Sequence, residues 1–148
     1  MPMIEIWDGP RVAFADLLSA VPAVDELSWS ILEFWGVARD DGMDVVAMER
    51  EAAESFTGLH LSASQLREFA AGLFQLIDGI IVGYRDSPPT RVDPDLRESA
   101  EVVIEAIDST FWRVYARDRG ITDGLQHHYD DVRDVKPEVA LSAAHRES

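Results

Sequence analysis

The sequence predicts an α+β fold: a single domain whose mainly antiparallel sheet of about six strands carries about three helices. Three observations support this class. Two β-branched and aromatic segments between residues 101 and 116 flank the turn Asp108-Ser109-Thr110, as in a β-hairpin. Ser62 and Gln65 have the spacing of a helix capping box. Short apolar segments alternate with turn-forming residues along the rest of the chain.

The hairpin is expected to supply the central strands, with helices packed against one side. Because side chains alternate along a strand, every second residue shares a face. These residues are Val102, Ile104 and Ala106 in the first strand, and Trp112, Val114 and Ala116 in the second. Glu105 alternates with these core positions, so it is expected to face solvent or to pair with Arg113 across the hairpin.

The N-terminal segment predicts a strand and then a helix. Residues 3–7 form an apolar strand candidate, which the turn Asp8-Gly9-Pro10 ends. Apolar residues then recur at helical spacing and stop at Pro22: Phe14, Leu17, Leu18 and Val21. We interpret this stripe as core packing.

Residues 27–48 predict a second hairpin. A strand from Leu27 to Ala38 is followed by Asp40-Asp41-Gly42 and by another apolar run from Met43 to Met48. Helix is the competing interpretation for residues 46–56, because glutamate and alanine favour helix over strand. The secondary structure of residues 49–58 stays open.

The capping box at Ser62 begins an amphipathic helix, with Leu61 and Leu66 as a hydrophobic staple. This helix is predicted to end at Gly79, or alternatively near Gly72. Asp78 is then a turn residue, and residues 80–84 form a strand buried on both faces.

Residues 86–96 are rich in proline and predict a loop that either connects two strands passively or covers a binding site. Asp118 is expected to cap a last helix, followed by a short edge strand around Val132 and Val135. The domain is predicted to span residues 1–135. Residues 136–148 are predicted to be a flexible tail.

Charge is the unusual feature of the composition, with 28 acidic against 13 basic residues and a formal net charge of −15. A field of this sign disfavours nucleic acid and anionic membranes as partners and favours basic ones. No apolar run approaches the ~18 residues of a membrane span. The absence of cysteine and of an export signal leads us to expect a cytoplasmic location.

Motifs for catalysis, phosphate binding or metal binding are absent from the sequence. His127 and His128, with Asp130 and Asp131, come nearest to a metal set, but adjacent helical side chains point about 100° apart. We therefore predict no catalytic residue, no metal ligand and no cofactor.

A protein partner, with basic character, is the predicted ligand. All four tryptophans lie in predicted strands, so a sheet covered by helices on one face can leave some of them on the other. The predicted partner-binding residues are two tryptophans and two acidic segments: Trp35, Trp112, Asp40, Asp41, Asp44, Asp130, Asp131 and Asp134.

Residues 104–135 follow the order strand, Asp-Ser-Thr, aromatic strand (residues 111–115), Arg117-Asp118, helix, then Asp131-Val132-Arg133-Asp134. This order resembles the C-terminal half of small bacterial immunity-type proteins, the antitoxins that neutralise a cognate toxin. The resemblance implies a non-catalytic α+β domain that binds and blocks a toxin, and the acidity suits a basic one.

Two alternatives remain open. The first is a small-ligand binder or enzyme whose site is assembled under residues 86–96. The second is a homodimer that assembles through an exposed sheet edge.

Overall fold

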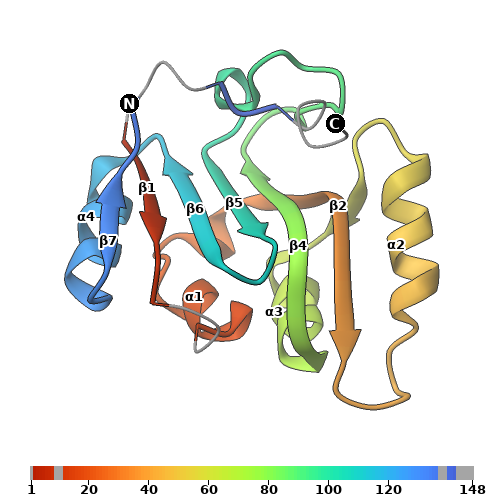
Figure 1. Cartoon of the computed structure of the whole chain (residues 1–148). Coiled ribbons are helices and arrows are strands. Elements are labelled where there is room, and N and C mark those ends of the chain that lie inside the picture. The colour runs from red at the N-terminus through yellow and green to blue at the C-terminus, as the bar shows by residue number, and fades with distance from the viewer. Residues whose placement is uncertain (1, 9–11, 137–139, 143–148) are drawn as a thin grey trace.

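The computed structural model describes residues 2–8, 12–136 and 140–142, and this part of the chain forms one seven-stranded antiparallel sheet with four α-helices (Figure 1). The predicted α+β class is confirmed, with one strand and one helix more than expected. The sheet order is β3-β2-β4-β5-β6-β1-β7. The strands are β1 (Met3–Ile6), β2 (Ser28–Ala38), β3 (Leu59–Leu61), β4 (Leu73–Tyr84), β5 (Val102–Ile107), β6 (Phe111–Ala116) and β7 (Val132–Asp134).

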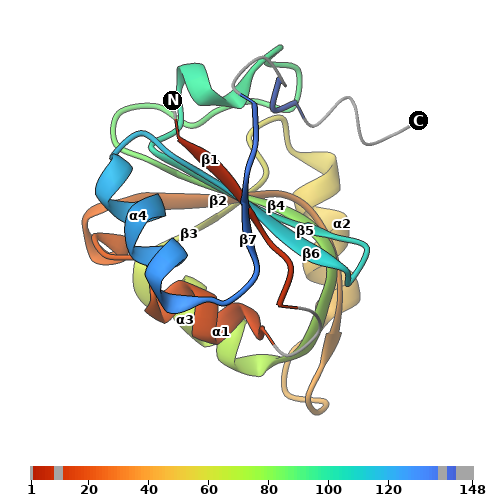
Figure 2. The ribbon, with the colours of Figure 1, turned by 60° about the vertical axis from the view of Figure 1, so that its left-hand side comes forward.

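The helices are α1 (Phe14–Ser19), α2 (Val45–Glu54), α3 (Ala63–Gly72) and α4 (Arg119–His128), with short 3₁₀ turns η2 (Val24–Glu26) and η3 (Leu96–Glu98). Helices α1 and α3 lie together on one face of the sheet (Figure 2). Helix α4 contacts β6, while α2 runs beside β2. No helix in the described ranges has the length and apolar character needed to cross a membrane.

The larger core lies between the sheet and the helices α1, α3 and α4. The hairpin prediction is confirmed, because both predicted sets of inward side chains are buried in this core. Trp29 is fully buried there, and its indole N–H donates to the Val24 carbonyl at 3.0 Å. Gly83 makes room for this ring, since a Cβ at that position would lie 3.0 Å from it.

A smaller core covers half of the other sheet face. Its strand residues are Met3, Leu32, Ile80, Val82, Val103 and Tyr115. Leu96 and Ala100 pack on them from the connection between β4 and β5. The loop predicted at residues 86–96 therefore covers a packed apolar layer.

Arg91 holds this loop against the sheet edge. Its guanidinium donates to the carbonyl oxygens of Leu32 and Ala52, and its backbone N–H donates to the Phe56 carbonyl at 2.9 Å. Ala52 lies in the last turn of α2, where helix carbonyls lack partners within the helix. One arginine thus ties together the loop, β2 and α2.

The predicted strand at residues 43–48 is wrong, because α2 begins at Val45. Asp44 caps this helix, with its Oδ1 accepting from the Ala47 N–H at 3.0 Å. The competing helix interpretation of residues 46–56 is confirmed over most of its length. The helix propensity of this segment and the cap at Asp44 therefore favour helix, although the apolar run at residues 43–48 is typical of a strand.

Helix α3 ends at Gly72, as the alternative interpretation proposed, and the predicted end at Gly79 is wrong. The capping box is confirmed, with Ser62 and Gln65 exchanging hydrogen bonds of 2.9 and 3.1 Å. β4 begins directly at Leu73 and pairs with β2 along its whole length. Asp78 therefore lies inside a strand and is not a turn residue, because long-range pairing overrode the local helical pattern.

The ends of the chain follow the prediction in part. Asp118 caps α4 through a 2.8 Å hydrogen bond from the Gly120 N–H, and β7 is the expected edge strand. In the predicted turn at residues 8–10, Gly9 and Pro10 lie outside the described residues. The predicted tail is described at residues 136 and 140–142, and there Leu141 is buried in the smaller core rather than free in solvent.

Leu141→Ala is expected to lower the free energy of unfolding by about 2 kcal/mol or more, because it removes a buried side chain from the smaller core. Urea denaturation measures this change. Val92→Ala, at an exposed apolar position of the loop, is the control and should change stability by less than about 0.5 kcal/mol. Equal effects of the two substitutions would contradict the anchoring of residue 141.

Candidate functional site

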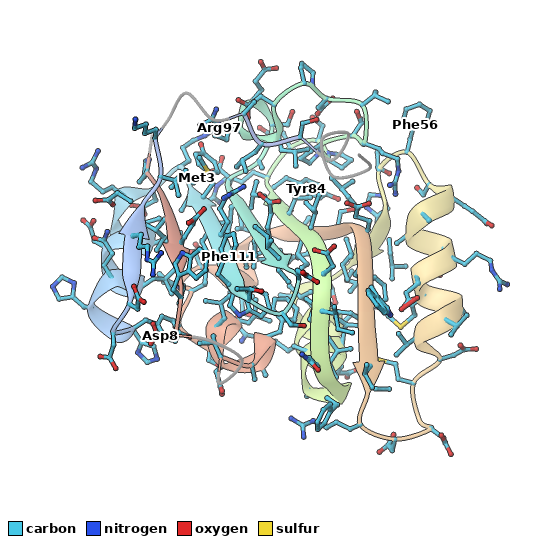
Figure 3. All side chains as sticks on the ribbon, viewed as in Figure 1. Met3, Asp8, Phe56, Tyr84, Arg97 and Phe111 are labelled. Atoms are coloured by element: carbon cyan, nitrogen blue, oxygen red, sulfur yellow. The ribbon has the colours of Figure 1, made fainter. Side chains whose placement is uncertain are left out.

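The candidate site lies on the sheet face opposite helices α1 and α3. The β4–β5 connection covers half of this second face, and the other half, which it leaves uncovered, is the candidate site. Figure 1 looks onto this face: α3 lies behind β4, and the β4–β5 connection crosses only the upper part. In Figure 3, Phe111 lies on this uncovered part, whereas Arg97 marks the covering connection. We call the uncovered part the open half-face. Its residues are Glu5, Trp7, Glu33, Trp35, Asp78, Glu105, Phe111 and Arg113.

Strand register places charged side chains of this face in one row. Glu5 is opposite Arg133 on one side and opposite Arg113 on the other, and Arg113 is opposite Glu105. Across Ile80, the row continues to Glu33. Acidic and basic side chains therefore alternate from β7 to β5. At the β2 side the row ends with two carboxylates, those of Glu105 and Glu33.

Arg113 bridges two carboxylates in this row. Its Nη2 lies 2.8 Å from Glu5 Oε2, and its Nη1 lies 3.9 Å from Glu105 Oε1. Of the two alternatives predicted for Glu105, pairing with Arg113 is confirmed and exposure to solvent is wrong, because Glu105 is only 6% exposed. Burial raises the pKa of Glu105 to about 7; Arg113 opposes this rise, while Glu33 and Glu5 add to it.

At the β7 edge of the open half-face, aromatic and basic side chains stack. The rings of Trp7 and Phe111 are parallel to within 12°, with centroids 4.2 Å apart. The Arg133 guanidinium carbon lies 4.4 Å from the centre of the Trp7 ring, and Arg133 Nε lies 3.2 Å from Asp131 Oδ1. The tryptophan at this edge, Trp7, is therefore already in contact with a cation of the same chain, Arg133.

At the β2 edge, a hollow of about 160 Å³ is lined by Glu33, Phe34, Trp35, Asp78 and Gly79. Trp35 is opposite Asp78 across the β2–β4 pair and is 59% exposed. The lining contains two carboxylates and no basic side chain. We call this site the Trp35 hollow.

Of the two tryptophans predicted to bind a partner, the structure exposes one. Trp112 is 6% exposed, stacks on Phe14 and donates its indole N–H to the Val12 carbonyl at 3.2 Å. Its place in β6, on the same face as Val114, directs it into the larger core, so it is not available to a partner in the folded chain.

The two predicted acidic segments do not form one patch. Asp40, Asp41 and Asp44 lie in the connection from β2 to α2, whereas the segment from Asp130 to Asp134 lies at β7. In the sheet order, β2 and β7 are five strand spacings apart, or roughly 24 Å. Several of these carboxylates have local partners, such as the Gly42 N–H for Asp40 and Gln126 for Asp134.

Asp130 and Asp131 line a wide groove of about 610 Å³ together with Asp8, Asp16 and Tyr129. Burial raises the pKa of Tyr129 to about 12, and Asp16 and Asp8 add to this rise. Residues 9–11, which connect two lining residues, lie outside the described part of the chain. The groove is therefore not assigned as a site.

The histidines have local roles where they are described. His127 Nδ1 lies 2.8 Å from the Asp123 carbonyl oxygen, and the ring of His128 packs edge-on against Tyr129. No group of three or more potential metal ligands occurs within residues 2–8, 12–136 and 140–142.

Comparison with family models, curated proteins and solved structures finds no significant match to this chain. The candidate site therefore rests on its own geometry, and the resemblance to immunity-type proteins stays a prediction.

The sequence did not identify Glu33 or Arg113 as residues of the same sheet face as Trp35. Glu105 and Asp78 stood out as acids in apolar surroundings, and that signal correctly marks two of the carboxylates on this face. Their proximity to Glu33 depends on which strands pair and in what register, which no local pattern encodes.

Glu105→Gln is expected to remove a pH dependence of stability. With a pKa of about 7 when folded against 4.5 as its ordinary value, Glu105 binds more protons in the folded state between these pH values. The free energy of unfolding of the wild type therefore falls as pH rises from 4.5 to 7. At pH 8 the variant should be more stable by roughly 2–3 kcal/mol, and near pH 5 the difference should shrink towards zero.

Urea denaturation at pH 5, 6.5 and 8 measures this difference. Glu51→Gln, which removes one negative charge from an exposed position of α2, is the matched control. A difference between wild type and Glu105→Gln that stays constant from pH 5 to 8 would show that the carboxyl does not titrate in this range.

Proposed function

We propose that this chain is a non-catalytic protein-binding domain that docks a basic partner on the open half-face. The observation that carries the proposal is the position of Trp35, a tryptophan 59% exposed on a sheet face, beside the carboxylates of Glu33 and Asp78.

An exposed tryptophan on a rigid strand suits a binding surface. β2 pairs with β4 over its full length and α2 packs beside it, so Trp35 projects from an ordered backbone. Tryptophan is enriched among the residues that dominate binding energy, since it buries a large area while few side-chain torsions are lost. Val37, two residues further along β2, is also exposed and extends the apolar surface.

Electrostatics supports a basic partner. The chain has a formal net charge of −15, and the Trp35 hollow has only acidic charge in its lining. Complementary charge accelerates association and selects against acidic partners, and this contribution weakens with added salt.

Cavity size supports a protein partner over a small molecule. The Trp35 hollow, at about 160 Å³, is smaller than the roughly 300–1,000 Å³ typical of ligand pockets. Among the cavities described above, none is lined by residues 86–96, so the alternative of a site beneath that loop gains no support. The raised pKa of Glu105 favours acid–base chemistry as a second function, but Glu105 does not line the hollow.

Toxin neutralisation is the specific form of this function that the immunity-type resemblance adds. A basic toxin would match the charge of the open half-face. Protection of cells that express such a toxin, encoded beside this chain, tests this form. If the Trp35→Ala variant still protects the cells, toxin neutralisation does not depend on the open half-face.

Affinity capture with paired baits tests the proposed function. The wild type and Val46→Ala, at an exposed position of α2, should retain the same partner. Trp35→Ala should weaken retention at least about 30-fold, because truncating a central tryptophan costs about 2 kcal/mol or more. Added salt should elute the partner from all baits.

A partner that binds wild type and Trp35→Ala equally would contradict the proposed face. Light scattering of the purified chain tests the remaining alternative. A dimer that Trp35→Ala leaves intact would point to assembly through a sheet edge.

A further inference from the structure

The sheet has a notch where the β5–β6 hairpin ends before β4 does. β5 pairs with β4 from Gly79 to Gly83, whereas the earlier part of β4, residues 73–78, pairs only with β2 among the described strands. The hairpin turn therefore lies beside the middle of β4 (Figure 1). Below this turn, an opening of about 70 Å³ leads into the larger core. We call it the hairpin notch, and its apolar walls include Phe14, Ala70, Leu73, Phe74, Leu76 and Trp112.

The chemistry of the hairpin notch differs from that of the acidic surface around it. None of the described residues that line it carries an ionisable side chain, although the chain has a formal net charge of −15. Its polar side chains are engaged with one another or with the backbone. The Gln75 amide donates to Ser109 Oγ at 2.9 Å, and Thr110 Oγ1 donates to a carbonyl of the turn at 3.0 Å. This lining favours an uncharged, apolar occupant, because a charged group would lose its hydration there without gaining a partner.

An exposed aromatic side chain stands at the rim of the notch. Phe74 lines the notch and is nevertheless 68% exposed. Its neighbours Leu73 and Gln75 pair with consecutive residues of β2, so Phe74 is the extra residue of a register shift. Such irregularities re-aim a side chain and are frequent beside binding sites.

The turn of the hairpin forms another wall in a strained conformation. Asp108 and Ser109 have φ angles of 50° and 58°, in the left-handed region that residues other than glycine rarely adopt. The Ser109 N–H donates to the Ile77 carbonyl at 2.8 Å, which holds the turn against β4. Backbone strain that tertiary contacts maintain in this way is typical of segments that shape a binding site.

We propose that the hairpin notch receives one aliphatic side-chain end, of leucine size or smaller, from the partner that docks on the open half-face. This inference rests on the proposed function and adds an apolar anchor to it. The two surfaces are continuous, since Phe111 belongs to the open half-face and also lines the notch.

The volume of the notch favours an aliphatic over an aromatic occupant. At about 70 Å³ it has roughly half the volume of the ~150 Å³ cavity that accommodates a benzene ring in another protein. An aromatic side chain would therefore have to displace walls that belong to the packed core, and such overpacking is unfavourable. A branched aliphatic end fits without this displacement.

An NMR titration of the full chain, ¹³C-labelled at its methyl groups, with N-acetyl-leucine amide tests the inference. The methyl signals of Ala70, Leu73 and Leu76 should shift together, because these side chains line the notch. The dissociation constant should be roughly 10–100 mM, as the burial of one leucine side chain allows. N-acetyl-phenylalanine amide should bind at least about threefold more weakly, although its apolar surface is larger.

Two substitutions with matched controls separate the notch from general apolar contact. Ala13→Leu adds a side chain at the half-buried rim and should weaken binding of the leucine probe about fivefold or more. Ala53→Leu, at an exposed position of α2, should leave it within about twofold. Phe74→Ala should weaken binding about threefold, whereas Phe56→Ala, at a residue 65% exposed and outside the notch, should not. Well-dispersed spectra of all four variants verify that they fold.

Capture of the partner with the same variants as baits completes the test. Ala13→Leu should weaken retention of the partner at least about fivefold relative to Ala53→Leu, because the notch is then closed to the side chain that the partner inserts.

A leucine probe that does not bind, or a phenylalanine probe that binds equally well or more tightly, would overturn the inference. Retention of the partner that Ala13→Leu leaves unchanged would overturn it too, since the notch would then take only a free apolar molecule. In either case, capture that depends on Trp35 leaves the proposed function standing, whereas capture that depends on neither residue removes both. A dimer of the purified chain that Ala13→Leu dissociates would assign the notch to a second copy and also overturn the inference.

Discussion

The rest of the structure depends on the antiparallel pairing of β2 with β4. This pairing contains a shift in register. The two strands pair from Ser28 opposite Tyr84 to Ala38 opposite Leu73, and the register shifts between Ile31 and Glu33. A shift of this kind inserts one residue and reverses the alternation of side chains beyond it. Trp29 and Ile31 face the larger core before the shift.

The same irregularity explains why Trp35 is exposed. Strict alternation from Trp29 and Ile31 would direct residues 33 and 35 into the larger core. After the shift, Phe34 enters the core instead, and Glu33 and Trp35 turn to the opposite face. A single inserted residue therefore builds the Trp35 hollow, and it does so without disturbing the core that Phe34 shares with Phe69.

This constraint also sets the limit of prediction from sequence. The β5–β6 hairpin could be predicted residue by residue, because both strands alternate regularly and the turn is local. The start of β4 could not, since residues 73–78 carry a helical pattern and become a strand only by pairing with β2, about 40 residues away. Trp35 was identified as a binding residue by its type, but its neighbours Glu33 and Asp78 come together only through that long-range register.

The two halves of the second sheet face show opposite solutions to the same physical problem. A sheet face must be covered or made polar, and the upper half is covered by Leu96, Ala100 and Leu141. The lower half is instead built from charged side chains, with Arg113 placed between Glu5 and Glu105 to offset the cost of bringing carboxylates together.

Near β7 the guanidinium of Arg133 lies over Trp7 and contacts Asp131, whereas Trp35 at the β2 edge is 59% exposed. If charge were there only to keep the face soluble, an apolar ring would be the residue least suited to the end of the row. Trp35 and the carboxylates of Glu33 and Asp78 instead form a surface that is both apolar and acidic. At one edge of the face the fold itself covers the tryptophan ring, and our proposal is that a basic partner covers the ring at the other.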